Sequence, residues 1–126
     1  MPRDLKILLV DDDAEKRFLI ALHLAREFKE AELIECDSGA AAIAHLEMHS
    51  VNAVVTDNSM SPVNGVELIR WLRERNQHLP VVMVTGNPEI ERVAVKAGAS
   101  VVVTSQRFGE VGGILKRLFR EGEAPE

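Results

Sequence analysis

Short apolar runs alternate with longer amphipathic stretches along the chain. The apolar runs are rich in β-branched residues and cover residues 5–10, 31–36, 52–56, 80–85 and 100–104. They are too continuous for strands with one solvated face, and they predict strands buried on both faces, as in a parallel sheet. The stretches between them carry apolar residues at helical spacing. They predict helices over residues 14–29, 38–48, 65–75, 88–97 and 108–121.

The residues at the segment ends agree with this alternation. Asp13 and Ser38 are placed as N-caps of the first two helices. Pro88 stands in the first turn of the fourth helix, and Gly98 follows its end. Five strand–helix units in series imply right-handed crossovers with helices on both faces of the sheet. We therefore expect an α/β fold built on a doubly wound, five-stranded parallel sheet.

The length of 126 residues fits one domain with a substantial core. We expect a single domain over residues 1–121 and a flexible tail over 122–126, because the last residues, EGEAPE, carry no apolar pattern. Gly112 and Gly113 lower the helix propensity at the start of the last predicted helix. They indicate either a late start of that helix or the close approach of a partner on its face.

Composition and charge narrow the classes of partner. The formal net charge of −5, without a basic run, argues against nucleic acid as a direct partner. No apolar stretch approaches the ~20 residues of a membrane span, and the first residues, MPRDLK, lack the apolar region of a signal peptide. The single cysteine, Cys36, excludes an internal disulfide and fits a reducing compartment. These features predict a cytoplasmic protein without membrane contact.

Polar residues follow four of the five predicted strands at the point where each strand ends. They are Asp11, Asp12 and Asp13 after the first strand, Asp57 after the third, Thr85 at the end of the fourth, and Ser105 and Arg107 after the fifth. In doubly wound sheets, ligands bind beyond the carboxyl ends of the strands. A single aspartate at such a place is commonly only a cap or turn residue. Their joint occurrence at several strand ends predicts a site.

The chemistry of this site follows from its carboxylates. Asp11, Asp12 and Asp57 are expected to converge and to repel one another by about 1–4 kcal/mol per pair. A hard cation relieves this repulsion, and an oxygen-only cluster favours Mg²⁺ over zinc. Mg²⁺ keeps open positions that suit a phosphoryl group, and a carboxylate beside it can attack phosphorus to give an aspartyl phosphate. The Thr85 hydroxyl is placed to hydrogen-bond a phosphoryl oxygen.

Four segments carry this pattern in order: ILLVDDD, VVTDNSMSPVNGVEL, VVMVTG and KAGASVVVT. In their order and spacing they resemble the receiver domain of bacterial two-component response regulators, and the resemblance spans residues 5–120. It implies a (βα)5 flavodoxin-like receiver fold. It also implies a signalling domain that accepts a phosphoryl group and is not an enzyme in the usual sense.

The resemblance implies an acceptor and a metal site. Asp57 is then the phosphoacceptor, which takes the phosphoryl group from a phosphohistidine of a sensor histidine kinase or phosphotransfer protein. Asp11 and Asp12 form an acidic pocket for Mg²⁺, with Asp57 and the backbone carbonyl of Ser59 as further ligands. Within that pocket we expect Asp12 to be a direct ligand and Asp11 to act through water, while Asp13 caps the first helix.

The resemblance also assigns roles around the acceptor. Thr85 matches the hydroxyl that couples phosphorylation to conformational change, called the switch hydroxyl. Ser59 and Asn87 occupy the positions that tune dephosphorylation. Gly65 matches the turn glycine that follows the acceptor loop.

The largest departure from the family pattern lies after the fifth strand. The family places a lysine there, and this chain has Ser105. The missing ammonium ordinarily pairs with the phosphoryl group, and a charge-assisted hydrogen bond of this kind contributes about 1.5–3 kcal/mol. Phosphorylation is still expected without it, but its coupling to conformational change is expected to weaken. Arg107 is a candidate substitute for the missing charge.

Two smaller departures concern the switch and the acceptor loop. Val102 stands where the family usually has an aromatic switch residue, and valine suits a buried strand. In the loop MSPVNG, Pro62 falls one place later than is usual. Because proline restricts itself and its predecessor, the path of the loop near residues 59–61 is expected to differ.

Three functions remain open from the sequence. The first is a phosphoacceptor receiver that signals to an unknown downstream protein, with a homodimer through the fourth and fifth helices compatible with the pattern. The second is a degenerate receiver that acts as a phosphorylation-independent interaction module, as the missing lysine suggests. The third is a haloacid-dehalogenase-like phosphatase with Asp11 as nucleophile, based on the spacing of Asp11 and Asp13 and on VVMVTGN. That third function leaves Asp57 without a role.

Overall fold

A computed structural model of the protein describes residues 5–123. Strands and helices alternate along it. The elements are β1 (Lys6–Val10), α1 (Ala14–Glu27), β2 (Glu32–Cys36), α2 (Gly39–Met48), β3 (Ala53–Thr56), α3 (Gly65–Arg75), β4 (Val81–Thr85), α4 (Pro88–Ala97), β5 (Val101–Thr104), a 3₁₀ segment η1 (Ser105–Glu110) and α5 (Val111–Glu123). Each element overlaps the range expected from the apolar pattern.

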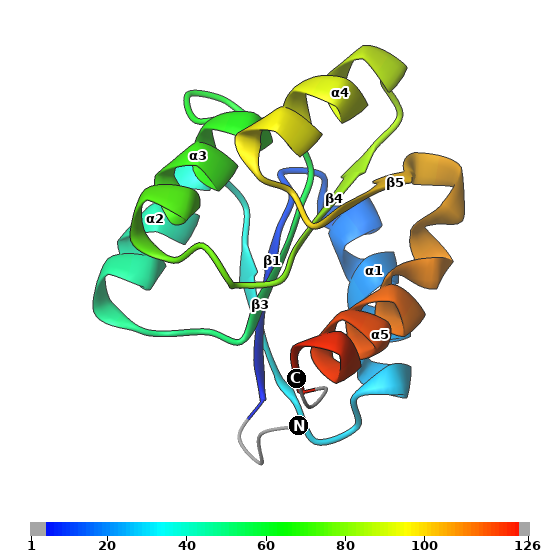
Figure 1. The fold of residues 1–126 in the computed structure, drawn as a ribbon. Helices are drawn as coiled ribbons and strands as arrows, with labels where there is room; N and C mark the ends of the chain where they lie inside the picture. Colours follow the sequence, from blue (N-terminus) through cyan, green and yellow to red (C-terminus); the bar gives the residue numbers. More distant parts are fainter. Residues whose placement is uncertain (1–4, 124–126) are drawn as a thin grey trace.

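The five strands form one parallel sheet in the order β2-β1-β3-β4-β5 (Figure 1). The chain therefore steps outward from β1 to the edge at β2, returns to β3 on the other side of β1, and continues to the far edge at β5. This reversal places the carboxyl ends of β1 and β3 side by side. The expected doubly wound α/β fold is confirmed.

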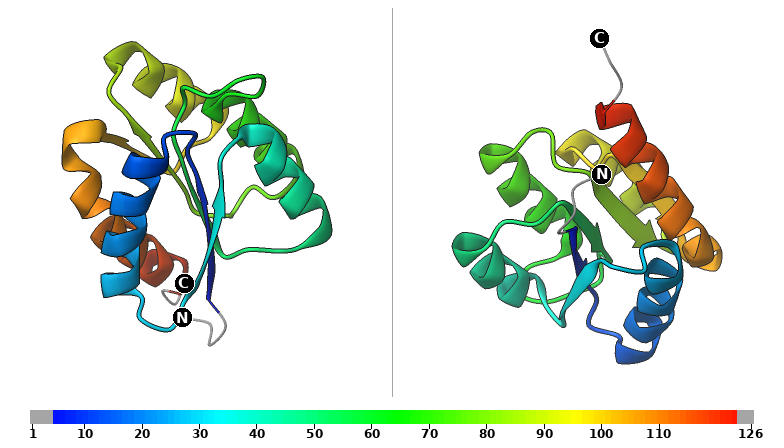
Figure 2. Two further views of the ribbon diagram at one scale, coloured as in Figure 1. Left: turned by 180° about the vertical axis from the view of Figure 1, so that it is seen from behind. Right: turned by 90° about the horizontal axis from the view of Figure 1, so that it is seen from below.

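Helices cover both faces of the sheet (Figure 2), and a hydrophobic core lies on each face. Along β1, Ile7 and Leu9 pack with α1 and α5, whereas Leu8 and Val10 pack with α2, α3 and α4. These four side chains are fully buried because successive residues of a strand point to opposite faces. The continuous apolar runs thus have the physical cause expected from the sequence: a central parallel strand needs apolar side chains on both faces.

The expectation of burial on both faces is wrong for the two edge strands. All residues of β3 and β4 are buried, but no residue of β2 is, and in β5 only Val103 is. An edge strand has one sheet neighbour, and its outer side is covered only in part. Val102, expected as a buried-strand residue, is half-buried for this reason.

The helix ends follow the expected capping chemistry. The Asp13 side chain accepts from the backbone N–H groups of Glu15 and Lys16, and Ser38 caps α2. Pro88 begins α4, and Gly98 ends it in the left-handed conformation with φ of 119°. These caps fix where each helix leaves the edge of the sheet.

The start of α5 is later than the expected residue 108. Residues 105–110 form η1, and α5 begins at Val111 with Gly112 and Gly113 in its first turn. A Cβ on Gly112 would lie 3.0 Å from Cβ of Glu27, so the close approach on this side is made by α1 of the same chain. The helix extends through Glu123, two residues into the expected tail, and residues 124–126 lie outside the described part.

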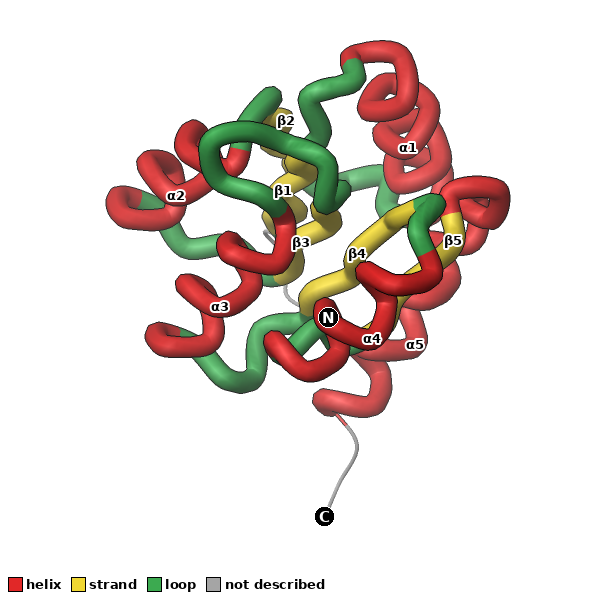
Figure 3. Tube along the Cα trace, turned by 90° about the horizontal axis from the view of Figure 1, so that it is seen from above, coloured by secondary structure: helices red, strands yellow, loops and turns green. Residues whose placement is uncertain are grey.

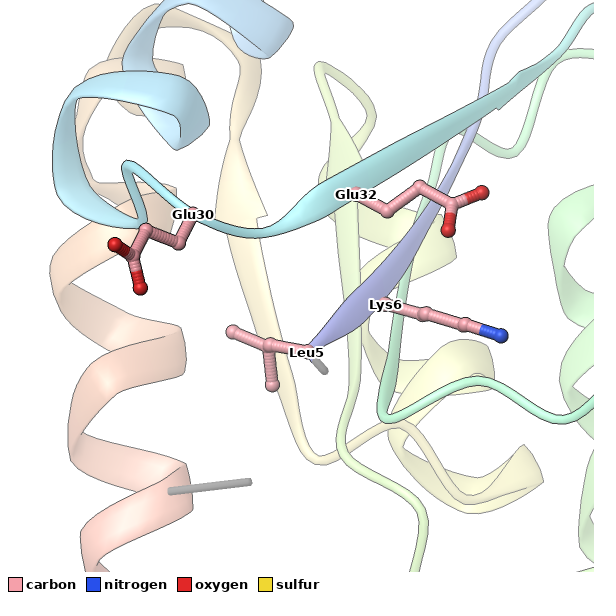
Figure 4. Close-up of a pocket in the computed structure, with 4 residues that line it drawn as sticks. All are labelled: Leu5, Lys6, Glu30 and Glu32. Atoms are coloured by element: carbon pink, nitrogen blue, oxygen red, sulfur yellow. The ribbon is translucent and has the colours of Figure 1, made fainter. Parts of the chain in front are cut away.

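One hollow lies at the amino-terminal ends of the strands, on the side of the sheet opposite their carboxyl ends. It is lined by Leu5, Lys6, Glu30 and Glu32, near the starts of β1 and β2 (Figure 4). Its side chains combine one cation and two carboxylates at the surface and form no enclosed cavity. Within the described residues, no helix has both the length and the apolarity needed to cross a membrane.

Candidate functional site

Strand pairing brings the expected acidic residues together. β1 and β3 are neighbours, and Val10 lies opposite Thr56 in their register. Asp11 and Asp57 therefore follow directly from two paired residues, and the backbone N–H of Asp57 donates to the carbonyl of Val10 at 3.0 Å. Figure 3 looks onto this edge of the molecule, where the loops after β1 and β3 meet.

The three carboxylates form one cluster. Asp11, Asp12 and Asp57 each offer an oxygen within 4.8 Å of the others. Their exposure differs: the Asp11 side chain is 1% exposed, that of Asp57 is 11% exposed, and Asp12 faces solvent. These side chains therefore converge, as expected from their positions at strand ends.

Asp11 is the most constrained member of the cluster. Its Oδ1 accepts from the backbone N–H of Asp13 at 2.9 Å, and its Oδ2 has no hydrogen-bond partner among the described residues. Burial raises the pKa of this carboxyl above its ordinary value, and the neighbouring Asp57 carboxylate raises it further. The hydrogen bond from the Asp13 N–H and the charge of Lys16 lower the pKa, but the net shift is upward. A buried carboxylate oxygen without a partner is costly and calls for a cation.

The donor set fits a hard divalent cation. All the clustered side-chain donors are carboxylate oxygens, and one of them is buried without a hydrogen bond; an oxygen-only donor set of this kind suits Mg²⁺. Asp11, Asp12 and Asp57 would hold the ion. Ser59, the further ligand implied by the resemblance, lies exposed two residues after Asp57.

A cation of the chain itself already reaches this cluster. Nζ of Lys16 lies 3.4 Å from Oδ1 of Asp57 and 3.7 Å from Oδ2 of Asp11, with the lysine side chain 23% exposed. No role for Lys16 was predicted from the sequence. Its position could have indicated it: Lys16 lies three residues after the cap Asp13, and residues at this spacing lie on the same face of a helix, here the face toward the carboxylates. Its neighbour Arg17 donates to the backbone carbonyl of Asp11 at 2.6 Å.

The acceptor loop is closed by Asn58, also missed from the sequence. Its buried side-chain oxygen accepts from the N–H of Val66 at 3.0 Å, and its carbonyl accepts from the N–H groups of Met60 and Gly65. The loop thereby folds back onto the start of α3. Within it, the peptide bond between Ser61 and Pro62 is cis.

Thr85 and Asn87 lie at the end of β4. The Thr85 side chain is buried, and its hydroxyl accepts from the backbone N–H of Asn87 at 3.2 Å. Asn87 in turn caps α4 by accepting from the N–H of Glu89. Thr104 lies opposite Thr85 in the register, and Ser105 follows it. The structure thus brings Thr85 and the serine at the lysine position to the same edge of the sheet as the acidic cluster.

Arg107 engages a different partner from the acidic cluster. Its guanidinium makes two hydrogen bonds to the carboxylate of Glu110, at 2.6 and 2.7 Å, on the exposed surface of η1. Bidentate pairs of this kind fix the orientation of the guanidinium. The positive charge nearest to Asp57 that the structure describes here comes from Lys16.

Neutralising Asp11 should stabilise the protein when divalent cations are chelated. The raised pKa means that the folded protein holds this proton more tightly than the unfolded chain, so the contribution favours folding at low pH and is lost as pH rises through the raised value. At pH 7 in EDTA we expect Asp11→Asn to raise the free energy of unfolding by about 1 kcal/mol. Urea denaturation measures the change.

Asp13→Asn is the matched control, because asparagine caps a helix as well as aspartate and the side chain is exposed. It should change stability by no more than a few tenths of a kcal/mol. Added Mg²⁺ should stabilise the wild type more than Asp11→Asn. A variant that is less stable than the wild type in EDTA would contradict this account of the cluster.

Comparison with known proteins agrees with this geometry. Residues 7–106 match the model of the response regulator receiver domain. The chain is 35% identical over 99 residues to the chemotaxis protein CheY of Pseudomonas aeruginosa, covering 77% of this chain and 79% of that protein. It is 32% identical over 89 residues to the sensor protein EvgS of Escherichia coli, covering 71% of this chain and 7% of EvgS.

Solved structures show the same fold. The receiver domain of the Francisella response regulator 1452 superposes with a TM-score of 0.83 at 20% identity, covering 94% of this chain and 99% of that chain. At this identity the likeness concerns the fold alone. The match to the family model and the relative above 30% identity establish the family.

Proposed function

The chain belongs to the response regulator receiver domain family, and we propose that Asp57 is its phosphoacceptor. Receiver domains of two-component systems are signalling domains that interact with sensor kinases or phosphotransfer proteins. The phosphatase alternative from the sequence gains no support, since it leaves without a role Asp57, the acidic residue that follows β3. The proposal therefore concerns which residues of this chain take part in the phosphoryl transfer.

The single observation that carries the assignment is the placement of Asp57 in the cluster. It is the one member that is neither closed off nor fully solvated: its side chain is 11% exposed, against 1% for Asp11 and an exposed Asp12. A nucleophile must be reachable by the phosphoryl donor yet held in place. The N–H of Asp57 is anchored to Val10, which fixes the backbone from which the carboxylate projects.

The step is a simple displacement at phosphorus. An oxygen of Asp57 forms a bond to phosphorus while the bond from phosphorus to the donor nitrogen of a phosphohistidine breaks, and the imidazole keeps that electron pair and takes up a proton. With acetyl phosphate the leaving group is acetate. Mg²⁺, when bound, neutralises charge on the transferring group. Asp11 and Asp12 would hold the ion, and the Thr85 hydroxyl would donate a hydrogen bond to a phosphoryl oxygen once the group is attached.

We place the read-out of this event on the face formed by α4, β5 and α5. A shallow hollow there is lined by residues of β5 together with Glu91, Arg107, Ile114 and Arg117. We propose that a downstream protein, or a second copy of the chain in a homodimer, binds this face of α4, β5 and α5. Val102, which lacks the usual aromatic ring, lines the same hollow.

The experiment is phosphorylation by a small donor. Incubation with acetyl phosphate and Mg²⁺, followed by intact-mass measurement, should show one added phosphoryl group per chain. When EDTA replaces Mg²⁺ in the incubation, most of the adduct should fail to form, because the carboxylate cluster then repels the incoming dianion. An unmodified protein under conditions that phosphorylate a chemotaxis receiver such as CheY would contradict the proposal.

A second function is favoured by one specific observation. Ser105 replaces the lysine that ordinarily pairs with the phosphoryl group, which is what a phosphorylation-independent interaction module would tolerate. In that case the protein would bind its partner equally well with and without the donor. The same mass measurement separates the two functions, because the interaction module takes no adduct.

A further inference from the structure

The first turn of α1 carries a positive charge in an unusual place. Lys16 lies three residues after the cap Asp13, where the helix dipole presents its positive end and favours acidic side chains. Its long side chain is nevertheless three-quarters covered and extends to the carboxylates of Asp57 and Asp11, at 3.4 and 3.7 Å. The helix dipole does not favour a lysine at this position, whereas the carboxylates of the acidic cluster do.

The position where the family has its lysine offers no charge. Ser105 lies beside Gly86, with its Oγ 3.4 Å from where a Cβ on Gly86 would stand, and its side chain ends at a hydroxyl. Arg107 is occupied by Glu110. Among the residues that the structure describes, Lys16 is the cation within ion-pair distance of Asp57.

We propose that Lys16 supplies, from α1, the ammonium that pairs with the phosphoryl group on Asp57. The inference rests on the proposed function and names a residue for it. The contact is already made to an Asp57 oxygen, and a phosphorus atom bonded to Asp57 carries its three oxygens one bond further out. The flexible stem of lysine follows this displacement by rotation. The ammonium keeps its protons, donates hydrogen bonds to the phosphoryl oxygens, and breaks no bond.

The consequence is a changed geometry of signalling. In the family pattern, the lysine after the fifth strand ties the phosphoryl group to β5. A lysine from α1 would tie it to the opposite side of the site instead, beside β1. Phosphorylation should therefore be stabilised, while its mechanical link to β5 depends on Thr85 alone.

The test compares Lys16→Met with the wild type and with Lys16→Met/Ser105→Lys. Methionine keeps the apolar stem and removes the charge. With acetyl phosphate and Mg²⁺, we expect Lys16→Met to form the adduct about 10- to 100-fold more slowly, as the loss of one charge-assisted hydrogen bond predicts. Adding Ser105→Lys should restore most of the rate, since an ammonium then approaches from the side of β5.

Lys96→Met, at the end of α4, is the matched control and should phosphorylate like the wild type. Thermal unfolding in EDTA checks that each variant is folded. If Lys16→Met forms the adduct at the wild-type rate, Lys16 merely balances the acidic cluster and the inference is overturned. If the wild type takes no adduct at all, the proposed function itself fails. Failure of Ser105→Lys to restore the rate would overturn the electrostatic role of Lys16.

Discussion

Gly65→Ala should destabilise the protein by about 2–4 kcal/mol, the range expected when an added carbon overlaps rigid neighbours. A Cβ on Gly65 would overlap the backbone carbonyl oxygen of Asp57 and lie 2.9 Å from Cα of Asn58 and 2.8 Å from Cε of Met83. Two of these neighbours are backbone atoms of the acceptor loop and cannot turn away. The loop must therefore shift, and Asp57 with it.

Gly113→Ala provides the control, because nothing lies within 4 Å of a Cβ at that position in the first turn of α5. It should be neutral or stabilising by up to about 1 kcal/mol, since alanine favours the helix. Urea denaturation of both variants measures the difference. Gly65→Ala with wild-type stability would show that the acceptor loop is not held as tightly as the hydrogen bonds of Asn58 indicate.

Asp57→Asn should abolish the phosphoryl adduct, the largest functional effect expected of any single substitution here. The amide is a poor nucleophile toward phosphorus and leaves only two carboxylates in the cluster. Asparagine has nearly the same shape as aspartate, so the protein should still fold, and thermal unfolding checks this. Intact mass after incubation with acetyl phosphate and Mg²⁺ gives the result directly.

Asp11→Asn is the informative counterpart. If Asp57 is the acceptor, loss of Asp11 weakens the hold on the cation and slows the reaction without removing the acceptor, so an adduct still accumulates over longer incubation. A haloacid-dehalogenase-like phosphatase would give the reverse pattern, with the adduct lost in Asp11→Asn and retained in Asp57→Asn. The exposed cap variant Asp13→Asn should resemble the wild type.

The central strands and the acidic convergence were predictable from sequence for a physical reason. Apolar runs such as residues 53–55 occur where both faces of a strand are covered, and parallel strands bring their carboxyl ends to the same side of the sheet. Once the fold was inferred, Asp11 and Asp57 had to meet. The caps Asp13 and Ser38 were predictable for a different reason, because each accepts hydrogen bonds from backbone N–H groups only two or three residues further along the chain.

The features that were missed depend on the third dimension. Strand burial at the edges was overestimated because β2 was treated as an apolar run, although Glu32 and Glu35 within it are exposed and β2 has one neighbour in the sheet. Lys16 was overlooked because its contact crosses from α1 to β3, and no periodicity in the sequence links residues 16 and 57. The close packing of Gly112 against Glu27 likewise joins two helices distant in the chain.

The chemical identity of the modified residue decides whether Asp57 is the phosphoacceptor. The acyl phosphate formed with acetyl phosphate and Mg²⁺ can be reduced by borohydride, which converts the modified aspartate to homoserine, and peptide mass spectrometry then locates it. We expect homoserine at position 57 alone. Homoserine at position 11, 12 or 13 instead, or an unmodified chain throughout, would contradict the assignment of Asp57 as the phosphoacceptor.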